Sequence, residues 1–495
     1  MSTDHPPSGW DSLNAPLIKQ TGFREYDCRW RFPEDINLRG FVRVGMALGT
    51  QAQNLNQGCE IIVGNDFRSY SLTIKHAFVI GLIASGMKVV DIGTVISPMA
   101  YYARTRLSIS CVGMVTASHN PNGWTGIKTG FAPPFTHSPE EMAQLKKIIL
   151  ENKEEEREGG QYTTYDGIAA DYLAHLSEGN KLSRKLKVVC ATGNGTASQF
   201  TPKFLQNIGA KVIHLHTDPD WTFPNYNPNP ESLLMLNDMK RMVKESQADL
   251  AIGIDGDGDR LGIVDDECEE IFSDKLGLIY ARQLAKKCPN SKFIVDVKST
   301  GAFERDSVLK EFGATVEYWK TGHSYMRRKT HEAEAILGIE KSGHFYFSPP
   351  VGDGFDCGLQ ATLQILKILD QFPSLKLSDL KKELPKTWLS PTMSPYCGDE
   401  VKYPIITKLT DKFFHMFRKK EQILGQNIDH VLTINGIRLV LEDGSWFLLR
   451  ASSNTPNLVV VCESTQSQHH LHNLFDFIRT HLNQEPEIGD FDQAI

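Results

Sequence analysis

Three stretches of the chain repeat one plan, and this repetition is the strongest constraint on the fold. Each stretch reads as a short apolar strand, a polar turn, an amphipathic helical segment, a glycine and a second strand. The strand pairs fall at residues 61–64 and 86–90, 188–191 and 209–213, and 293–296 and 313–317. Within one sheet, such a strand–helix–strand unit implies parallel strands joined by a right-handed crossover. The sequence therefore predicts three related α/β units in series.

A chain of 495 residues is too long for a single hydrophobic core, so several domains are expected. Composition and turn residues indicate where the boundaries between them lie. Ser138 opens a capping box with proline at the first helical position, so a helix begins there and ends in the charged run 153–160. Prolines between 385 and 395 end the third unit. The remainder reads as a helix from 402, strands within 432–441, 447–450 and 458–461, and a helix at 471–482. We predict three α/β domains with mixed, mostly parallel sheets and a smaller C-terminal α+β domain, at 1–160, 161–267, 268–384 and 385–495.

Charge and cysteine usage exclude several classes of protein. The net charge of −7, the isoelectric point near 6.2 and the lack of a long basic run argue against nucleic acid as a partner. No apolar run approaches the roughly 20 residues that span a bilayer, and the N-terminus has no signal pattern, so no membrane partner is expected. Nine cysteines are scattered without a C-x-x-C pair, which favours free thiols and a cytoplasmic location.

Three aspartates alternate with glycines directly after the apolar run 250–254. Asp255, Asp257 and Asp259 offer hard oxygen donors, which favour Mg²⁺, Mn²⁺ or Ca²⁺. A calcium-binding EF-hand loop also begins in this way, but it needs glycine where Arg260 stands and a strand-like run replaces its helix. The remaining alternative is a solvated Asp/Gly turn between two strands. The pattern favours a divalent-metal loop at the end of a strand.

A second polar loop follows the strand-like run 111–115. It reads Thr116-Ala117-Ser118-His119-Asn120-Pro121, and its Asn-Pro step favours an extended or turn geometry. Open α/β sheets bind ligands beyond the carboxyl ends of their strands. Ser118 and Asp255 both occupy such ends in successive units. A hydrolase-type Ser–His pair is disfavoured, because adjacent residues on an extended loop point apart and no G-x-S-x-G elbow is present. The lone G-x-G at 193–195 lacks the rest of a dinucleotide-binding motif.

Four loops together resemble those of the α-D-phosphohexomutases. Residues 116–121 with Gly126-Ile127-Lys128 are similar to that family's active-site loop, and 255–260 to its metal loop. Residues 338–344 are similar to its sugar-binding loop, and 450–456 to its phosphate-binding loop. Weaker resemblances to the family lie at 23–27, 223–225 and 321–324. The matches fall in order over nearly the whole chain. The family's architecture, three related α/β domains and a smaller fourth one around a central cleft, agrees with the repeats.

The resemblance implies an enzyme that interconverts hexose 1-phosphate and hexose 6-phosphate. It would act on mannose and/or glucose phosphates, as phosphomannomutase/phosphoglucomutase enzymes do, through a phosphorylated Ser118 and a hexose 1,6-bisphosphate that serves as intermediate and activator. One Mg²⁺ per chain would be held by Ser118, Asp255, Asp257 and Asp259. The implied catalytic residues are Ser118, His119, Lys128, Arg260, Arg29 and His344. The implied substrate-binding residues are Tyr26, Lys298, His323, Glu340, Ser342, His344, Arg450, Ser452, Ser453, Asn454 and Thr455.

Three alternatives remain open, and the sequence carries no signal for the oligomeric state. A phosphoglucosamine mutase would share the fold and the loops. A catalytically silent sugar-phosphate binding protein would keep only the binding site, and a metal-dependent phosphatase would release free phosphate. Two segments depart from the family pattern. Asp27-Cys28-Arg29-Trp30 replaces an Ile-Arg-Gly ending, and Ser453 and Asn454 stand where the family has Gly or Asn followed by Thr.

Overall fold

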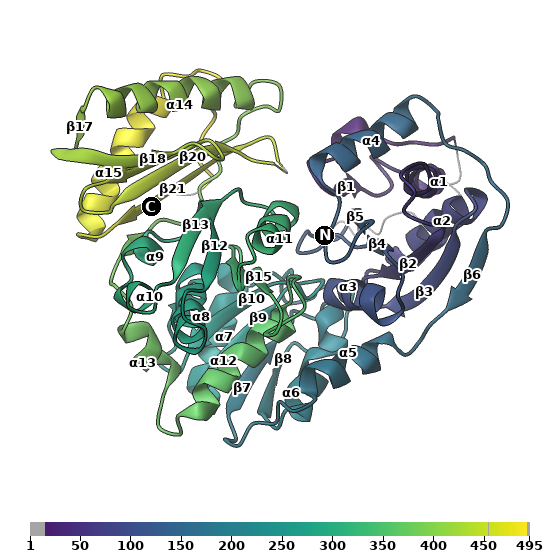
Figure 1. The fold of residues 1–495 in the computed structure, drawn as a ribbon, viewed down its shortest axis with the longest axis horizontal. Coiled ribbons are helices and arrows are strands. Elements are labelled where there is room, and N and C mark those ends of the chain that lie inside the picture. Colours follow the sequence, from purple (N-terminus) through teal and green to yellow (C-terminus); the bar gives the residue numbers. More distant parts are fainter. Residues whose placement is uncertain (1–14, 454, 493–495) are drawn as a thin grey trace. The chain divides into compact units, whose positions relative to one another are not determined.

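The computed structural model describes residues 15–453 and 455–492 (Figure 1). The residue contacts group the chain into two compact units. Unit 1 holds the residues up to Ser273 together with Ser342–Leu380, and unit 2 holds Asp274–Lys341 together with Lys381–Ile495. The polypeptide therefore passes from unit 1 to unit 2, back to unit 1 and again to unit 2.

The first sheet of unit 1 has six strands in the order β1-β5-β4-β2-β3-β6. Strands β2, β3, β4 and β6 run parallel, whereas β5 pairs antiparallel with both β4 and β1. The charged run 153–160 leads straight into β6, so this sheet continues past the domain end predicted at residue 160. Its elements are β1 (Cys28–Arg31), α1 (Leu38–Asn54), β2 (Glu60–Asn65), α2 (Ser71–Ala84), β3 (Lys88–Thr94), α3 (Ser97–Arg106), β4 (Cys111–Val115), β5 (Trp124–Gly130), α4 (Pro139–Leu150) and β6 (Gln161–Thr164).

The second sheet of unit 1 has the order β11-β10-β9-β7-β8. Strand β7 pairs in parallel with β8 and β9, and β9 turns back into the antiparallel β10. The turn between β9 and β10 carries the three aspartates. The elements are α5 (Ile168–Ser177), β7 (Lys187–Ala191), η3 (Thr196–Gln199), α6 (Thr201–Asn207), β8 (Lys211–Leu215), α7 (Leu233–Ser246), β9 (Leu250–Ile254), β10 (Leu261–Asp265) and β11 (Glu270–Ile271).

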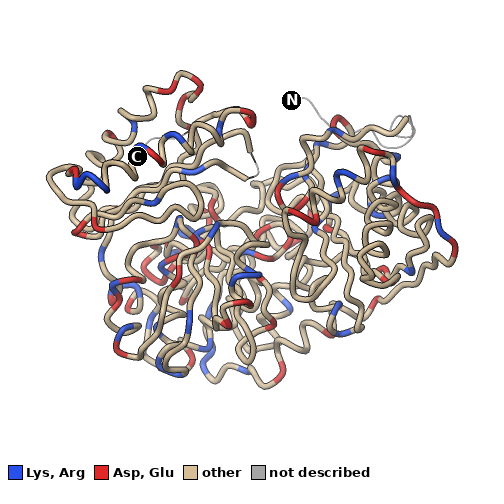
Figure 2. Tube along the Cα trace, turned by 45° about the horizontal axis from the view of Figure 1, so that its top comes forward, with Lys and Arg blue, Asp and Glu red and all other residues tan. Residues whose placement is uncertain are grey.

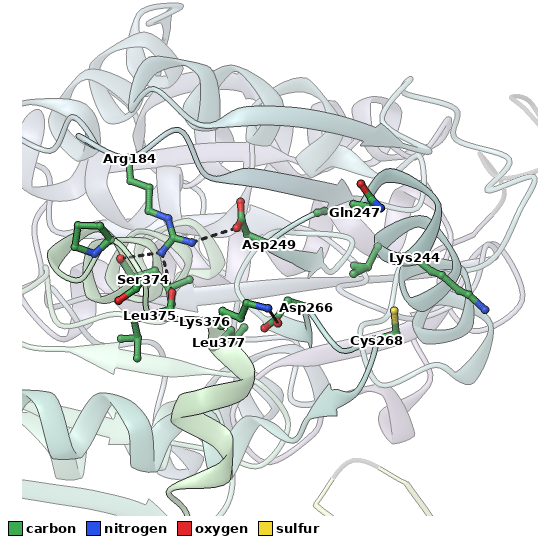
Figure 3. Close-up of a pocket in the computed structure, with 14 residues that line it drawn as sticks. Arg184, Lys244, Gln247, Asp249, Asp266, Cys268, Ser374, Leu375, Lys376 and Leu377 are labelled. Atoms are coloured by element: carbon green, nitrogen blue, oxygen red, sulfur yellow. Dashed lines mark hydrogen bonds and ion pairs between the residues drawn. The ribbon is translucent and has the colours of Figure 1, made fainter.

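The returning segment Ser342–Leu380 supplies β15 (Phe345–Phe347), α12 (Gly358–Gln371) and the start of α13 (Leu377–Lys382) to unit 1. Arg184, which precedes β7, holds this returning segment in place. It donates to the carbonyl oxygens of Leu369 (3.3 Å) and Leu375 (2.8 Å) in that segment, and it also pairs with Asp249. A cavity of about 560 Å³ lies beside these contacts (Figure 3). Its lining residues include none of the predicted site residues.

Unit 2 contains a parallel sheet and an antiparallel sheet. In the first, β12 pairs in parallel with β13 and β14. The second has six strands in the order β16-β21-β20-β19-β18-β17, all paired antiparallel. The elements are α8 (Ser273–Lys287), β12 (Lys292–Asp296), α9 (Ala302–Arg305), α10 (Ser307–Glu311), β13 (Thr315–Trp319), α11 (His323–Glu332), β14 (Leu337–Ile339), β16 (Trp388–Leu389), α14 (Lys402–Arg418), β17 (Gln422–Ile423), β18 (Gln426–Leu432), β19 (Ile437–Leu441), β20 (Trp446–Ala451), β21 (Leu458–Ser464) and α15 (Gln468–Leu482).

The structure confirms the three predicted strand–helix–strand units, because β2–β3, β7–β8 and β12–β13 are all parallel pairs. The capping box at Ser138 is confirmed as well. The predicted strand region 432–441 instead holds the end of β18, a turn with Gly436 at φ +78°, and β19. All nine cysteines are free thiols. No helix in the described part of the chain is long and apolar enough to cross a membrane.

The two sheets of unit 2 are joined through two buried charges on the antiparallel sheet. The Arg438 guanidinium lies 3.7 Å from the ring centroid of Trp446 and 4.2 Å from that of Tyr318. It donates to the carbonyl oxygens of Val297 and Ser299 in the loop after β12. Glu463 accepts hydrogen bonds from the Thr300 hydroxyl, the Gly301 amide and the Trp446 indole. The antiparallel sheet thereby holds the loop that carries Lys298.

Replacing Glu463 with glutamine tests this joint. Burial opposes the charge of Glu463, but Lys275 and the hydrogen bonds from Thr387, Thr300 and Gly301 lower its pKa to about 2. A folded-state pKa below the unfolded value near 4.3 stabilises the fold above about pH 4, and the effect fades as the pH falls toward 2. The wild type should exceed the variant by roughly 3 kcal/mol at neutral pH. Urea unfolding of both proteins between pH 3 and 7 measures the difference, and a difference independent of pH would contradict it.

Candidate active site

Ser118 lies on the loop after β4 in a backbone conformation that is rare for residues other than glycine. Its φ is +52° and its side chain is almost fully buried. Its amide donates to the Thr116 hydroxyl (2.9 Å), and its Oγ lies 3.3 Å from His119 Nδ1. Ser118 Oγ also lies 3.5 Å from Asp255 Oδ2, although the two residues are 137 positions apart. Two strand-end loops from different sheets of unit 1 therefore meet at this hydroxyl.

The three aspartates after β9 form a buried cluster in which one carboxylate oxygen from each residue lies within 4.8 Å of the other two. Asp255 Oδ1 accepts from the amides of Gly258, Asp259 and Arg260 at 3.0 to 3.2 Å, which curls the loop around its carboxylate. Gly256 is required, because a Cβ there would lie 2.4 Å from the Ser118 carbonyl oxygen. Burial and the neighbouring carboxylates raise the pKa of Asp255 well above its usual value.

The donor set of this cluster fits a hard divalent cation. All three residues present carboxylate oxygens, the ligands that Mg²⁺ and Mn²⁺ favour. No hydrogen-bond donor in the described residues reaches the buried Asp257 Oδ1. A buried anionic oxygen without a donor is costly, and a cation would offset that cost. The cluster could therefore hold a metal ion.

Three predicted basic residues of unit 1 lie near the aspartates, and two of them contact the cluster directly. Lys128 Nζ, on β5, lies 2.7 Å from Asp257 Oδ2 and 2.5 Å from Asp259 Oδ2. Despite burial, these two carboxylates raise the pKa of Lys128 well above its ordinary value. Arg29, on β1, pairs with Asp27 at 2.8 Å, and Arg260 Nε lies 3.9 Å from Asp255 Oδ2. Acidic and basic residues are interspersed along most of the trace (Figure 2), so the positive charge for an anionic ligand is local.

The returning segment places two further predicted residues beside the aspartates. Ser342 Oγ lies 2.9 Å from His344 Nδ1, and His344 Nε2 lies 3.4 Å from Asp259 Oδ1. The same nitrogen lies 3.8 Å from Asp356 Oδ2, a neighbour that the sequence did not single out. Tyr26 is buried just before β1, in the same unit. Ser118, His119, Lys128, Arg29, Arg260, Ser342 and His344 thus all belong to unit 1.

The predicted residues of unit 2 lie on loops after its parallel strands. Glu340, after β14, accepts a hydrogen bond from the Gly322 amide (2.7 Å), which places it beside His323 at the start of α11. Lys298 is 8% exposed, so it is not a solvated surface lysine. The sequence did not single out Asp296, at the end of β12. Its carboxylate accepts from the Ser299 and Thr321 hydroxyls and the Lys341 amide, and so ties all three loops together.

The predicted phosphate-binding loop leaves the end of β20. Arg450 Nη1 donates to the Ala451 carbonyl oxygen (2.8 Å), and Ser452 Oγ lies 2.8 Å from Thr455 Oγ1. Ser453 is half-buried, whereas Asn454 lies outside the described residues. Lys402, a buried residue that begins α14, donates to the carbonyl oxygens of Ser452 (2.7 Å) and Thr455 (2.9 Å). The sequence analysis missed Lys402, because nothing local marks a helix residue as the support of a loop 50 positions away.

Two residues after β2 were also missed. Asp66 accepts from the Ala117 amide (3.1 Å), and Arg68 donates to the carbonyl oxygens of Ser118 (3.0 Å) and Asn120 (2.6 Å). Their position in the sequence could have identified them. They follow the predicted strand 61–64, and the carboxyl ends of neighbouring parallel strands meet at one sheet edge, where the Ser118 loop is also expected.

Comparisons with known proteins agree with this geometry. Four successive family descriptions match the chain, namely "Phosphoglucomutase/phosphomannomutase, alpha/beta/alpha domain I" at residues 20–156, domain II at 170–268, domain III at 272–388 and "C-terminal domain" at 407–481. A phosphomannomutase/phosphoglucomutase of Pseudomonas syringae pv. tomato is 32% identical over 455 residues, which cover 92% of this chain and 94% of that protein. The chain belongs to the phosphoglucomutase/phosphomannomutase family.

Two further relatives place the chain within this family. A "Probable phosphoglucosamine mutase" of Pyrococcus horikoshii is 28% identical over 86% of this chain and 89% of that protein. The crystal structure of a phosphoglucomutase/phosphomannomutase family protein from Burkholderia thailandensis superposes with a TM-score of 0.85 at 30% identity, covering 96% of this chain and all of that one. The predicted fold class is confirmed, and so is the prediction of an enzyme. The chain is a phosphohexomutase.

The aspartate cluster predicts the effect of removing one ligand. Asp257→Asn should lower the affinity for Mn²⁺ by at least about tenfold, because even indirect support of a metal ligand is commonly worth that much. Isothermal titration calorimetry with Mn²⁺ measures the affinity without any need for turnover. Asp249→Asn, which alters a carboxylate in the same sheet region that pairs with Arg184, is the matched control. Equal affinities in the wild type and both variants would remove the cluster as a metal site.

Proposed function

We propose that this phosphohexomutase interconverts hexose 1-phosphate and hexose 6-phosphate of mannose and/or glucose through a phosphorylated Ser118. One observation carries the proposal: the buried Ser118 hydroxyl lies 3.5 Å from a carboxylate of the aspartate cluster, and Lys128 bridges the other two carboxylates of that cluster. A phosphoserine brings roughly −1.5 to −2 charges, so its site needs positive charge in place beforehand.

We propose that Asp255, Asp257, Asp259 and the Ser118 phosphate hold one Mg²⁺. When bound, such an ion neutralises charge on the transferring phosphoryl group and helps to orient it. In phosphoryl transfer the protein carries out little covalent chemistry itself, so its positioning of the reactants and its electrostatic stabilisation dominate the rate. Lys128, Arg29 and Arg260 supply fixed positive charge from the protein side.

The transfer exchanges one P–O bond for another. A sugar hydroxyl oxygen attacks the phosphorus of phosphoserine 118, and the bond between phosphorus and Ser118 Oγ breaks. The hydroxyl proton passes to a base, and the departing Ser118 Oγ takes up a proton. The product is a hexose 1,6-bisphosphate and a free serine. The reverse step, with the other phosphate of the sugar presented, rebuilds the phosphoserine. His119 and His344 are the side chains that we assign to proton transfer, because their ring nitrogens lie 3.3 Å from Ser118 Oγ and 3.4 Å from Asp259 Oδ1.

A second phosphate clamp is needed, because the sugar carries one phosphate that does not react in each half of the cycle. We assign this role to Arg450, with Ser452, Ser453, Asn454 and Thr455. A guanidinium fork beside hydroxyl groups suits phosphate. The Lys402 contacts to two carbonyl oxygens of this loop support a fixed shape.

Recognition of the sugar ring is assigned to a third set of residues. Glu340 and Ser342 would bind hydroxyls that both orientations of the sugar present, with Tyr26, Lys298 and His323 contributing. Asp296 supports this assignment, because it ties together the loops that carry Lys298, His323 and Glu340. We also propose the division into domains at 1–160, 161–267, 268–384 and 385–495, which the four consecutive family matches support. The short strand β6, which adds to the first sheet, lies just past the first of these ends.

Replacing Ser118 with alanine tests the phosphoserine. Ser118→Ala should lower kcat by at least about a thousandfold, since loss of a covalent catalyst commonly costs that much or more. Binding of glucose 6-phosphate, measured by calorimetry, should change little. Intact mass spectrometry of the wild type after incubation with glucose 1,6-bisphosphate should show one phosphoryl group, and peptide mapping should assign it to Ser118.

Ser110→Ala is the matched control, because it removes an exposed hydroxyl at the other end of β4. It should keep wild-type turnover. Undiminished turnover in Ser118→Ala, or a phosphoryl group mapped elsewhere, would refute the phosphoserine mechanism.

Turnover on three substrates separates the alternatives. Mannose 1-phosphate and glucose 1-phosphate should each exceed glucosamine 1-phosphate in kcat/KM by at least about tenfold, because a site built for a hydroxyl discriminates against an amine. The reverse preference would identify a phosphoglucosamine mutase. Free phosphate as the main product would identify a phosphatase, and binding without turnover would identify a silent binding protein.

A further inference from the structure

The loop that carries Ser118 is held against its own backbone preference. Ser118 has φ +52°, and residues with a Cβ occupy this region only sparsely. Such a conformation persists when the surrounding structure over-determines it. The residues that hold the loop therefore decide where the Ser118 hydroxyl points.

Two side chains from the loop after β2 form hydrogen bonds with the backbone of the serine loop on both sides of Ser118. The Asp66 carboxylate accepts from the Ala117 amide (3.1 Å), one residue before the serine. The Arg68 guanidinium donates from one nitrogen, Nη2, to the carbonyl oxygens of Ser118 (3.0 Å) and Asn120 (2.6 Å). Together they fix the peptide groups before and after the serine.

This Asp66–Arg68 pair is itself fixed. The two side chains are ion-paired, and both are almost fully buried. Asp66 Oδ1 also accepts from the Ser71 hydroxyl (2.5 Å), at the start of α2, and from the Arg68 amide (3.2 Å). Both side-chain oxygens of Asp66 therefore have partners: Oδ2 holds the Ala117 amide and the Arg68 guanidinium, and Oδ1 binds the Ser71 hydroxyl and the Arg68 amide.

The second sheet region of unit 1 covers the pair. The Phe223 ring lies 5.4 Å from the Arg68 guanidinium carbon, and the Thr196 hydroxyl accepts from the Phe67 amide (3.0 Å). Residues 223–225 are one of the segments with a weaker resemblance to the family. The contact with Arg68 shows that Phe223 packs against the side chain that binds the serine loop. The parts of unit 1 that carry the serine and the aspartates are thus joined through Arg68, in addition to the contact at Ser118.

We propose that Asp66 and Arg68 are positioning residues that hold the Ser118 hydroxyl against the Asp255 carboxylate. The inference rests on the proposed function of Ser118 as the phosphorylated residue. Arg68 donates to backbone carbonyl groups of the serine loop, so it acts through Ser118. Lysine cannot replace it, because an ammonium lacks the planar fork that serves Asp66 and two carbonyl oxygens at once.

A misplaced serine lowers the rate of transfer more than it lowers substrate affinity. A shift of about 1 Å in a reacting group can cost about 100-fold in rate. Because the sugar and its second phosphate are bound by other residues, the KM should stay within about threefold of the wild-type value.

Arg68→Lys tests the inference, with Arg104→Lys as the matched control. Arg104 is another buried arginine of the same domain, and it donates to the carbonyl oxygens of Ser110 (2.7 Å) and Phe135 (2.7 Å), away from the serine loop. Both variants lose a buried guanidinium, so both should be destabilised. Turnover is measured at a temperature at which circular dichroism shows both to be folded.

We expect Arg68→Lys to lower kcat by about 100-fold with little change in KM, whereas Arg104→Lys should keep kcat within about threefold of wild type. The rate at which glucose 1,6-bisphosphate phosphorylates the protein, followed by intact mass, should fall by the same factor as kcat in Arg68→Lys. Equal kcat values in the two variants would overturn the inference, because a merely structural role would affect both alike.

Two further variants keep the outcome decisive. If Arg68→Lys does not fold, Ser71→Ala removes one support of Asp66 and should lower kcat by roughly three- to tenfold at constant KM, and an unchanged kcat there would refute the inference. Ser118→Ala in the same series separates the two claims. Full turnover in Ser118→Ala refutes the proposed function, whereas an inactive Ser118→Ala beside a fully active Arg68→Lys refutes only the positioning role.

Discussion

The structure of unit 1 depends on placing three carboxylates within a few ångströms of one another and away from water. Buried like charges repel strongly, and each loses its hydration. The chain offsets this with backbone amides around Asp255, with Lys128 between Asp257 and Asp259, and with Arg29 and Arg260 nearby. Such an arrangement is costly as a structural device. It suits the proposed site, at which a cation and a phosphate would meet.

The sheet topology explains why these groups converge. Strands β2, β4 and β9 all end in polar loops, and parallel strands bring their carboxyl ends to one sheet edge. The loops after β2 and β4 belong to the first sheet, and the loop after β9 belongs to the second. Glycine at position 256 permits the close approach, because any side chain there would strike the Ser118 carbonyl oxygen. The serine, held at positive φ, then faces the aspartates.

In unit 2, buried charged side chains support the loops to which sugar and phosphate binding are proposed. Asp296, at the end of β12, ties together three loops that carry proposed sugar contacts, and Lys402 supports the proposed phosphate loop. Arg438 and Glu463 then fasten the antiparallel sheet to the loop of Lys298. Loops and strands from two different sheets of unit 2 are therefore joined by buried charged side chains that bind both backbone and side-chain groups.

The sequence by itself determined the three repeated units, the free cysteines, and the two strand-end loops that carry Ser118 and the aspartates. These features follow from local periodicity and from residue types at close spacing, which a single stretch of chain displays. Only the tertiary structure decided that Ser118 meets Asp255, that residues 342–380 return to unit 1, and that Asp66, Arg68, Asp296 and Lys402 support the loops. Contacts between residues 45 or more positions apart depend on how the chain packs, and an isolated aspartate or lysine in the sequence gives no sign of the group that it will bind.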